Sequence, residues 1–220
     1  MDLDRRMFLE LPLLGGLSTL VGPPLEVAAR AHRPQPGRSG LLRFGVMGDG
    51  GSGAQAQADI AAQMQAWRKQ APWEFALSLG DNVYENGETE HFDSRFLGVY
   101  RDLLSDGVPI HSTLGNHDVR NRDGREMVAT EGFGFIGKRD EYEMEAGPLL
   151  PDGKRLARFV CLNSNAWIDA VDQGDTGRLE RLHGDLRERL GRADKYRWNI
   201  AFFHHPIHSY VKKFFFGVDK

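Results

Sequence analysis

Apolar positions in this chain follow two different periods. Short apolar runs of strand length are each followed by small and polar residues, and then by segments in which apolar residues recur every three or four positions. The runs predict strands and the recurring positions predict helices. Strands are predicted within six stretches: Leu41–Met47, Trp73–Gly80, Pro109–Gly115, a short one near Tyr142–Gly147, Arg155–Ser164 and Tyr196–His204.

Three helices are predicted between these strands. Their apolar residues at helical spacing are Ile60, Met64 and Trp67; Phe92, Phe96 and Tyr100 within about 91–104; and Leu179, Leu182, Leu186 and Leu190. Residues 116 to about 155 are rich in glycine and charge, and they predict an elaborated loop. Alternating strands and helices indicate an α/β layered domain with a partly parallel sheet. Ligands bind such sheets beyond the carboxyl ends of the strands.

Composition limits the partners of the domain and the chemistry of any metal site. The 220 residues are 40% hydrophobic and 27% charged, with a formal net charge of -3, as expected for one globular domain. Because the chain has no basic excess, nucleic-acid binding is not expected. Cys161 is the single cysteine, so an intramolecular disulfide, a zinc ribbon and a CxxC redox site are excluded. A metal site must therefore use His, Asp, Asn or Tyr.

The N-terminal segment differs from the rest of the chain. Arg5 and Arg6 precede an uncharged, moderately apolar stretch, Leu11–Leu25, which is short for a membrane span of about 20 residues. This pattern resembles a twin-arginine export signal. We therefore expect a signal over 1–31, a linker over 32–40, a domain over 41–220 and export to the periplasm or medium. The alternative is an N-terminal tail that is disordered or amphipathic.

The glycine-rich turn after the first predicted strand has two incompatible interpretations. Gly48, Gly50 and Gly53 match G-x-G-x-x-G between a predicted strand and a predicted helix, which is the setting of a dinucleotide-binding loop. Alternatively, Asp49 within the same turn holds a metal ion. One such match is weak, so the rest of the chain must decide.

Polar clusters follow four of the predicted strands. Each alone is compatible with an ordinary turn or helix cap. Four clusters in the same position relative to their strands instead indicate a constructed site. Their residues are Asp49; Asp81 and Tyr84; Asn116, His117 and Asp118; and His204, His205 and His208.

The order GD, GD-x-x-Y, GNHD and H-x-P resembles the calcineurin-like metallophosphoesterases, and Tyr84 resembles the purple, or tartrate-resistant, acid phosphatases among them. The resemblance runs from about Leu41 to the C-terminus. It implies an α/β sandwich in which helices flank β-sheets. It also favours the metal interpretation of the glycine turn, because a dinucleotide site leaves Tyr84, Asn116 and His204 unexplained.

The resemblance implies a dinuclear site. Asp81 bridges two ions, Asp49 and Tyr84 bind the first, and Asn116 and His204 bind the second. A phenolate ligand suggests Fe(III) at the first position, with Fe(II), Zn(II) or Mn(II) at the second. The implied reaction is attack by a metal-bound hydroxide on a small phosphate monoester. The alternatives are a phosphodiesterase or nucleotidase of the same superfamily, and an inactive metal- or phosphate-binding fragment.

Further histidines complete the expected site. By the resemblance, His117 stabilises phosphate oxygens or protonates the leaving alkoxide, and Asp118 is a candidate to hold its imidazole; alternatively, His117 only supports the site through a hydrogen bond. His205 and His208 are candidates for substrate binding, although either could be a surface residue. The family's final G-H-x-H turn has no counterpart here, so the domain is expected to lack its C-terminal segment and one ligand per ion. The oligomeric state is left open.

Overall fold

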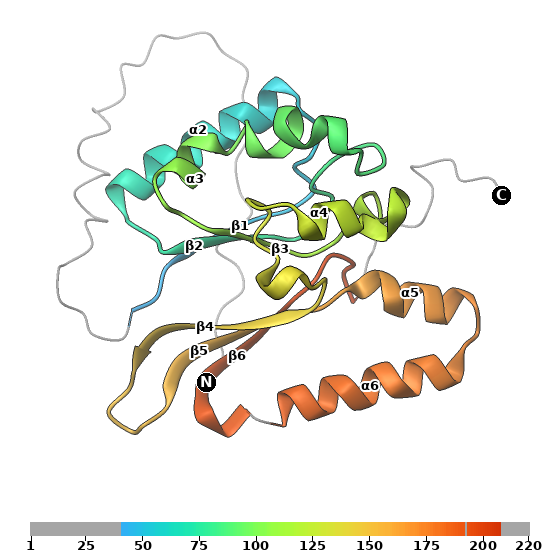
Figure 1. The fold of residues 1–220 in the computed structure, drawn as a ribbon. Helices are drawn as coiled ribbons and strands as arrows, with labels where there is room; N and C mark the ends of the chain where they lie inside the picture. Colours follow the sequence, from blue (N-terminus) through green and yellow to red (C-terminus); the bar gives the residue numbers. More distant parts are fainter. Residues whose placement is uncertain (1–40, 192, 208–220) are drawn as a thin grey trace, which may run out of the picture. The chain divides into compact units, whose positions relative to one another are not determined.

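The computed structural model describes residues 41–191 and 193–207 (Figure 1). The expected export signal over 1–31, the linker over 32–40 and the candidate substrate-binding residue His208 lie outside these residues. In the described part of the chain, no helix is long and apolar enough to cross a membrane.

A parallel three-stranded sheet is built from the first three predicted strands. It contains β1 (Phe44–Met47), β2 (Phe75–Ser78) and β3 (Ile110–Ser112), in the order β1-β2-β3. All four residues of β2 are buried, as expected for the central strand of a parallel sheet. Because the strands are parallel, their carboxyl ends meet at one edge.

A second, mixed sheet has the order β4-β5-β6. Strand β5 (Arg155–Cys161) pairs antiparallel with β4 (Tyr142–Leu149) and parallel with β6 (Tyr196–Phe202). Strand β4 is longer than the short strand expected within the 116–155 loop. The register of its pairing with β5 shifts between Ala146 and Leu149. The predicted α/β class with two sheets and flanking helices is therefore confirmed.

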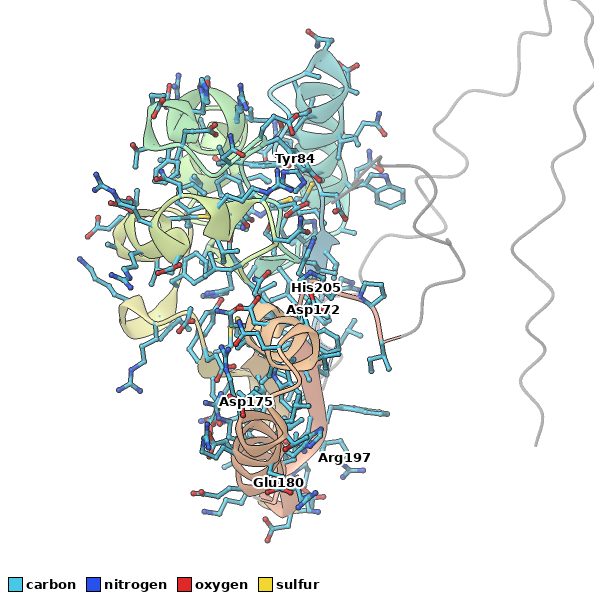
Figure 2. The ribbon with its side chains drawn as sticks, turned by 90° about the vertical axis from the view of Figure 1, so that its right-hand side faces the viewer. Tyr84, Asp172, Asp175, Glu180, Arg197 and His205 are labelled. Atoms are coloured by element: carbon cyan, nitrogen blue, oxygen red, sulfur yellow. The ribbon has the colours of Figure 1, made fainter. Side chains whose placement is uncertain are left out.

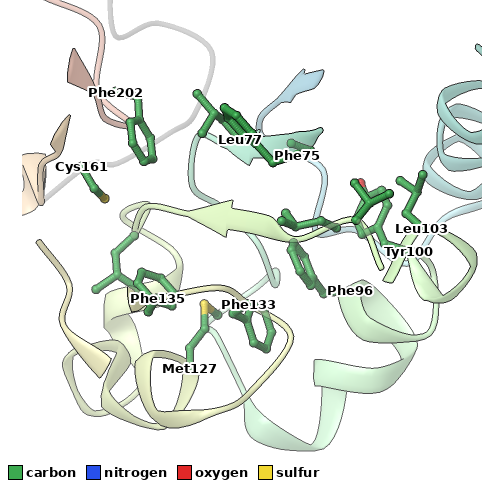
Figure 3. Packing of buried hydrophobic residues seen from close by; sticks show 14 of the residues in the cluster. Phe75, Leu77, Phe96, Tyr100, Leu103, Met127, Phe133, Phe135, Cys161 and Phe202 are labelled. Carbon is green, nitrogen blue, oxygen red and sulfur yellow. The ribbon is translucent and has the colours of Figure 1, made fainter. Parts of the chain in front are cut away.

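The sheets pack against each other through aromatic side chains (Figure 3). The ring of Phe159 on β5 meets Phe44 and Phe75 edge-on, with ring centroids 5.1 and 5.2 Å apart. Hydrogen bonds also join the sheets, since the Tyr142 hydroxyl donates to the Ser112 carbonyl at 2.7 Å. Cys161 is fully buried here, and burial raises the pKa of its thiol to about 12.

Helix α2 (Gln55–Gln70) follows β1 as predicted, but of its three predicted apolar residues only Met64 packs against the core. Ile60 and Trp67 are each more than half exposed among the described residues. The buried face carries Ala61 together with Gln57 and Gln65. The side-chain NH₂ groups of Gln57 and Gln65 donate to the Arg95 carbonyl at 2.7 Å and to Asp106 Oδ2 at 2.6 Å, respectively, so both buried donors have partners.

The helix predicted over 91–104 is broken into short pieces. A 3₁₀ turn (Thr89–His91), a π turn (Asp93–Leu97) and α3 (Arg101–Ser105) replace it, while Phe92, Phe96 and Tyr100 are buried together as expected. The Gly98 amide donates to the Asp93 carbonyl at 2.7 Å, which closes the wide turn. A Cβ at Gly98 would lie 2.6 Å from that carbonyl oxygen. The break therefore depends on this glycine.

Three further α-helices lie in the described part of the chain after α3. Helix α4 (Arg125–Ala129) lies in the segment expected to be irregular, and α6 (Thr176–Leu190) confirms the leucine-rich prediction, although its leucines are only partly buried. Helix α5 (Ser164–Asp172) was not predicted, because the strand before it was expected to run to Ser164. It begins where the Asn163 side chain accepts a hydrogen bond from the Asn165 amide at 3.2 Å.

Candidate metal centre

Four loops bring polar side chains to one place. Asp49 follows β1, Asp81 follows β2, Asn116 follows β3, and His204 follows β6. One possible ligand atom from each of Asp49, Asp81 and His204 lies within 4.8 Å of the others. Figure 2 labels Tyr84 and His205, which come from the loop after β2 and from the loop after β6. Residues from both sheets therefore share the site.

Two glycines allow the loops after β2 and β3 to touch. Gly80 has φ +90°, and a Cβ on it would lie 2.7 Å from the Gly115 amide nitrogen. A Cβ on Gly115 would in turn overlap the backbone nitrogen and the carboxylate of Asp81. Asp81 itself has φ 53°, in the left-handed region that few residues other than glycine adopt. The glycines before Asp81 and Asn116 therefore serve the close approach of the two loops.

Hydrogen bonding orients the imidazole of His204 toward the site. Its Nδ1 lies 2.8 Å from the Leu79 carbonyl oxygen, which can only accept, so Nδ1 carries a proton. In the neutral ring, Nε2 then presents a lone pair 3.1 Å from Asn116 Oδ1 and 3.5 Å from Asp81 Oδ1. Three acceptor atoms thus face one another. A cation between them would satisfy all three, so the donor set fits a metal ion.

Tyr84 places its phenol beside the two carboxylates. Its hydroxyl lies 3.4 Å from Asp49 Oδ1. Burial raises the pKa of the Tyr84 phenol well above its usual range, and the negative charges of Asp81 and Asp49 raise it further. Without a bound cation, the phenol therefore stays protonated beside these carboxylates. A nearby cation would offset both effects and favour the phenolate.

His117 is fixed next to the ligand cluster by its backbone and its ring. The backbone amide donates to Asp81 Oδ1 at 3.0 Å, and Nδ1 lies 2.6 Å from the Glu85 carbonyl oxygen. Nε2 consequently points toward the site, 4.0 Å from Asp81 Oδ2, while the ring packs edge-on against Tyr84. The Glu85 carbonyl, which no sequence pattern indicated, thus sets the orientation of the imidazole.

The interpretation of Asp118 as the residue that holds the His117 imidazole is wrong. Both carboxylate oxygens of Asp118 accept hydrogen bonds from Asn82, Val83 and Gly115, whereas the His117 ring bonds to the Glu85 carbonyl. Asp118 is fully buried, and burial raises its pKa to about 6 although these backbone donors oppose the rise. Asn82, which holds it, was missed by the sequence reasoning.

His205 lies beside the site and is held by the unpredicted helix α5. Its Nδ1 lies 2.9 Å from Ser164 Oγ, and its backbone amide donates to the same oxygen at 3.1 Å. Its ring packs edge-on against His204, with centroids 4.9 Å apart. Substrate binding by His205 stays a prediction. No motif in the sequence marked its partner Ser164.

Comparisons with known proteins agree with this geometry. Residues 42–218 match the model of the calcineurin-like phosphoesterase family. The chain is 33% identical to purple acid phosphatase 4 of Arabidopsis thaliana over 200 residues, which is 84% of this chain and 57% of that protein. It is 36% identical to tartrate-resistant acid phosphatase type 5 of Sus scrofa over 88 residues, or 36% of this chain and 26% of that protein. The chain thus spans little more than half of the longer match.

A solved structure shares the fold. The anchor protein GAP50 of the inner membrane complex of Plasmodium superposes with a TM-score of 0.62 at 21% identity, over 76% of this chain and 56% of that one. At this identity the similarity concerns the fold alone. The two sheets, the loops at their shared edge and the family match together lead to one conclusion: the chain belongs to the calcineurin-like phosphoesterase family.

Proposed function

We propose that this protein hydrolyses phosphate monoesters by means of two metal ions. The observation that carries the proposal is the convergence of Asp49, Asp81 and His204, whose ligand atoms lie within 4.8 Å of one another. Asn116 Oδ1 and the Tyr84 hydroxyl adjoin this cluster. The matches to purple and tartrate-resistant acid phosphatases support a monoester substrate.

Each ligand type suits a role in such a centre. Asp49 and Tyr84 would hold one ion, Asn116 and His204 the other, and the buried carboxylate of Asp81 would serve both. Two ions held in this way would supply an activated water and would neutralise charge on the phosphoryl oxygens. The protein's own part is to hold the ligands and to place donors around the ester.

His117 supplies the proton chemistry in this proposal. With Nδ1 bonded to the Glu85 carbonyl, the ring can present only Nε2 to a substrate. When both ring nitrogens carry a proton, Nε2 can donate a hydrogen bond to a phosphate oxygen or pass its proton to the leaving alkoxide. Arg120 Nη1 donates to the same carbonyl oxygen at 3.2 Å, so the loop that orients His117 is itself held.

Tyr84 makes iron the preferred metal of the first position, and this is testable by colour. The iron-loaded protein is expected to be violet or pink, because a phenolate bound to Fe(III) gives a visible charge-transfer band. Tyr84→Phe should abolish the band, as recorded by absorption spectroscopy on matched iron contents. Tyr196, whose hydroxyl lies far from these loops on β6, provides the control in Tyr196→Phe. A colourless, active, iron-loaded parent protein would remove Tyr84 from the ligand set.

The proposed reaction is tested with two substrates. We expect the metal-loaded protein to cleave an aryl phosphate monoester much faster than the matching aryl phosphodiester, with kcat/KM measured for both. A faster diester would instead place the protein with the phosphodiesterases of its family. Two tightly bound metals without turnover of either ester would favour a metal- or phosphate-binding function.

A further inference from the structure

The Asp118 carboxylate is the most heavily hydrogen-bonded acidic group at the site among the described residues. Oδ1 accepts from the Asn82 amide at 2.9 Å and the Val83 amide at 3.1 Å. Oδ2 accepts from Asn82 Nδ2 and the Gly115 amide, each at 2.8 Å. We call this carboxylate and its four N–H donors the Asp118 clamp. All four acceptor positions of the carboxylate are therefore used.

The donors belong to two different loops. Asn82 and Val83 directly follow Asp81, and Gly115 directly precedes Asn116. One side chain thus ties the loop of the shared carboxylate to the loop of an expected ligand of the second ion. Asn82 extends the connection to the last residue of β2 and to the residue after β3, since its Oδ1 accepts from Ser78 Oγ at 2.6 Å and its Nδ2 donates to the Thr113 carbonyl at 2.9 Å.

We propose that Asp118 is a positioning residue that sets the separation of Asp81 and Asn116 through the Asp118 clamp, without acting through the His117 imidazole. The inference rests on the metal centre of the proposed function. According to this inference, the hydrogen bonds of Asp118 hold the two ligand loops together even when no ion is bound. The glycine contact between Gly80 and Gly115 requires the same close approach.

A carboxylate is required because both oxygens must accept. An asparagine has one acceptor oxygen, so in either orientation its NH₂ group would face two N–H donors. An alanine leaves four buried donors without this partner, and each such loss costs about 1–3 kcal/mol. Either change should let the two loops separate.

The expected result of Asp118→Ala is weaker metal binding at both positions together. Residues that orient metal ligands typically change metal affinity by about 10–100-fold when replaced, and we expect a loss in this range. Affinity is measured with Zn(II) or Co(II) by chelator competition on the full chain, with the Co(II) absorption spectrum as a record of ligand geometry. If Asp118→Ala does not fold, Asp118→Asn is measured in the same way.

Two controls separate positioning from general destabilisation and from a role through His117. Leu103→Ala removes a side chain that is equally buried but lies on α3, away from the clamp. It should lower thermal stability while leaving metal affinity unchanged. In a double-mutant cycle, Asp118→Ala should weaken metal binding as much in a His117→Ala background as in the parent protein.

Three results would overturn the inference. The first is unchanged metal affinity in both Asp118 variants. The second is an equal loss of metal affinity in Leu103→Ala when its thermal stability matches that of the Asp118 variant. The third is that Asp118→Ala no longer weakens metal binding in the His117→Ala background. A parent protein that binds no metal would overturn the proposed function, and this inference with it.

Discussion

Asp81→Asn is expected to strip both metal positions and to abolish turnover. The Asp81 side chain is almost fully buried, with Oδ1 3.5 Å from His204 Nε2. A negative carboxylate between two cations offsets their mutual repulsion, whereas the neutral amide of asparagine does not. Removing one partner from a buried charge pair costs about 3–5 kcal/mol, which corresponds to roughly two to four orders of magnitude in affinity.

The Asp81 prediction is checked by metal analysis and turnover on the same samples. Asp152→Asn is the matched control, because it removes an equal charge from an exposed carboxylate that pairs with Arg197. The control should keep both metals and full activity. Retention of two ions by Asp81→Asn would show that another group joins the two metal positions.

His117→Ala is expected to keep its metals and lose about 10²-fold or more in kcat, since general acids contribute that much. Its Nε2 lies 4.0 Å from Asp81 Oδ2, and its ring packs edge-on against Tyr84. The loss should be largest for alkyl phosphates and smallest for esters of acidic phenols, because an acidic phenol leaves without protonation. Rates across a series of leaving groups, together with bound metal, measure both expectations.

His111 offers a matched control for this change. It also places Nδ1 near a carbonyl oxygen, that of Gly134 at 3.2 Å, but it lies on β3, where burial lowers the pKa of its imidazole. His111→Ala should leave the dependence on the leaving group unchanged. Loss of metal from His117→Ala would instead make His117 a ligand.

Most strands could be predicted because their apolar runs and their ends are local features of the sequence. The broken helix after residue 88 could not, since it depends on one close approach between Gly98 and the Asp93 carbonyl. Helix α5 escaped prediction for a related reason. Its first turn is polar, and the buried Asn165 side chain is held by the Leu114 carbonyl at 3.2 Å, across about fifty positions of the chain.

The residues of the site could be proposed from sequence because each follows a strand and has a side chain of a distinctive chemical type. Their supporting contacts could not be proposed in the same way. Asp118 was paired with its neighbour His117, whereas its actual partner Asn82 lies 36 positions away. Ser164 and His205 meet across 41 positions. Sequence adjacency indicates which residues gather at a strand end, and tertiary hydrogen bonds decide which of them touch.

The reactivity of the single cysteine can be used to measure how often the two sheets separate. Cys161 lies at the end of β5 within the buried cluster of Figure 3, and its sulfur is 3.6 Å from the carbonyl oxygen of Ser112 on β3. A raised pKa leaves almost no thiolate at neutral pH, and only the thiolate attacks disulfide reagents. The rate at which such a reagent modifies the protein therefore reports how often the two sheets part. If metal ions bind loops of both sheets, the logarithm of that rate should fall in proportion to the stabilising free energy that they add.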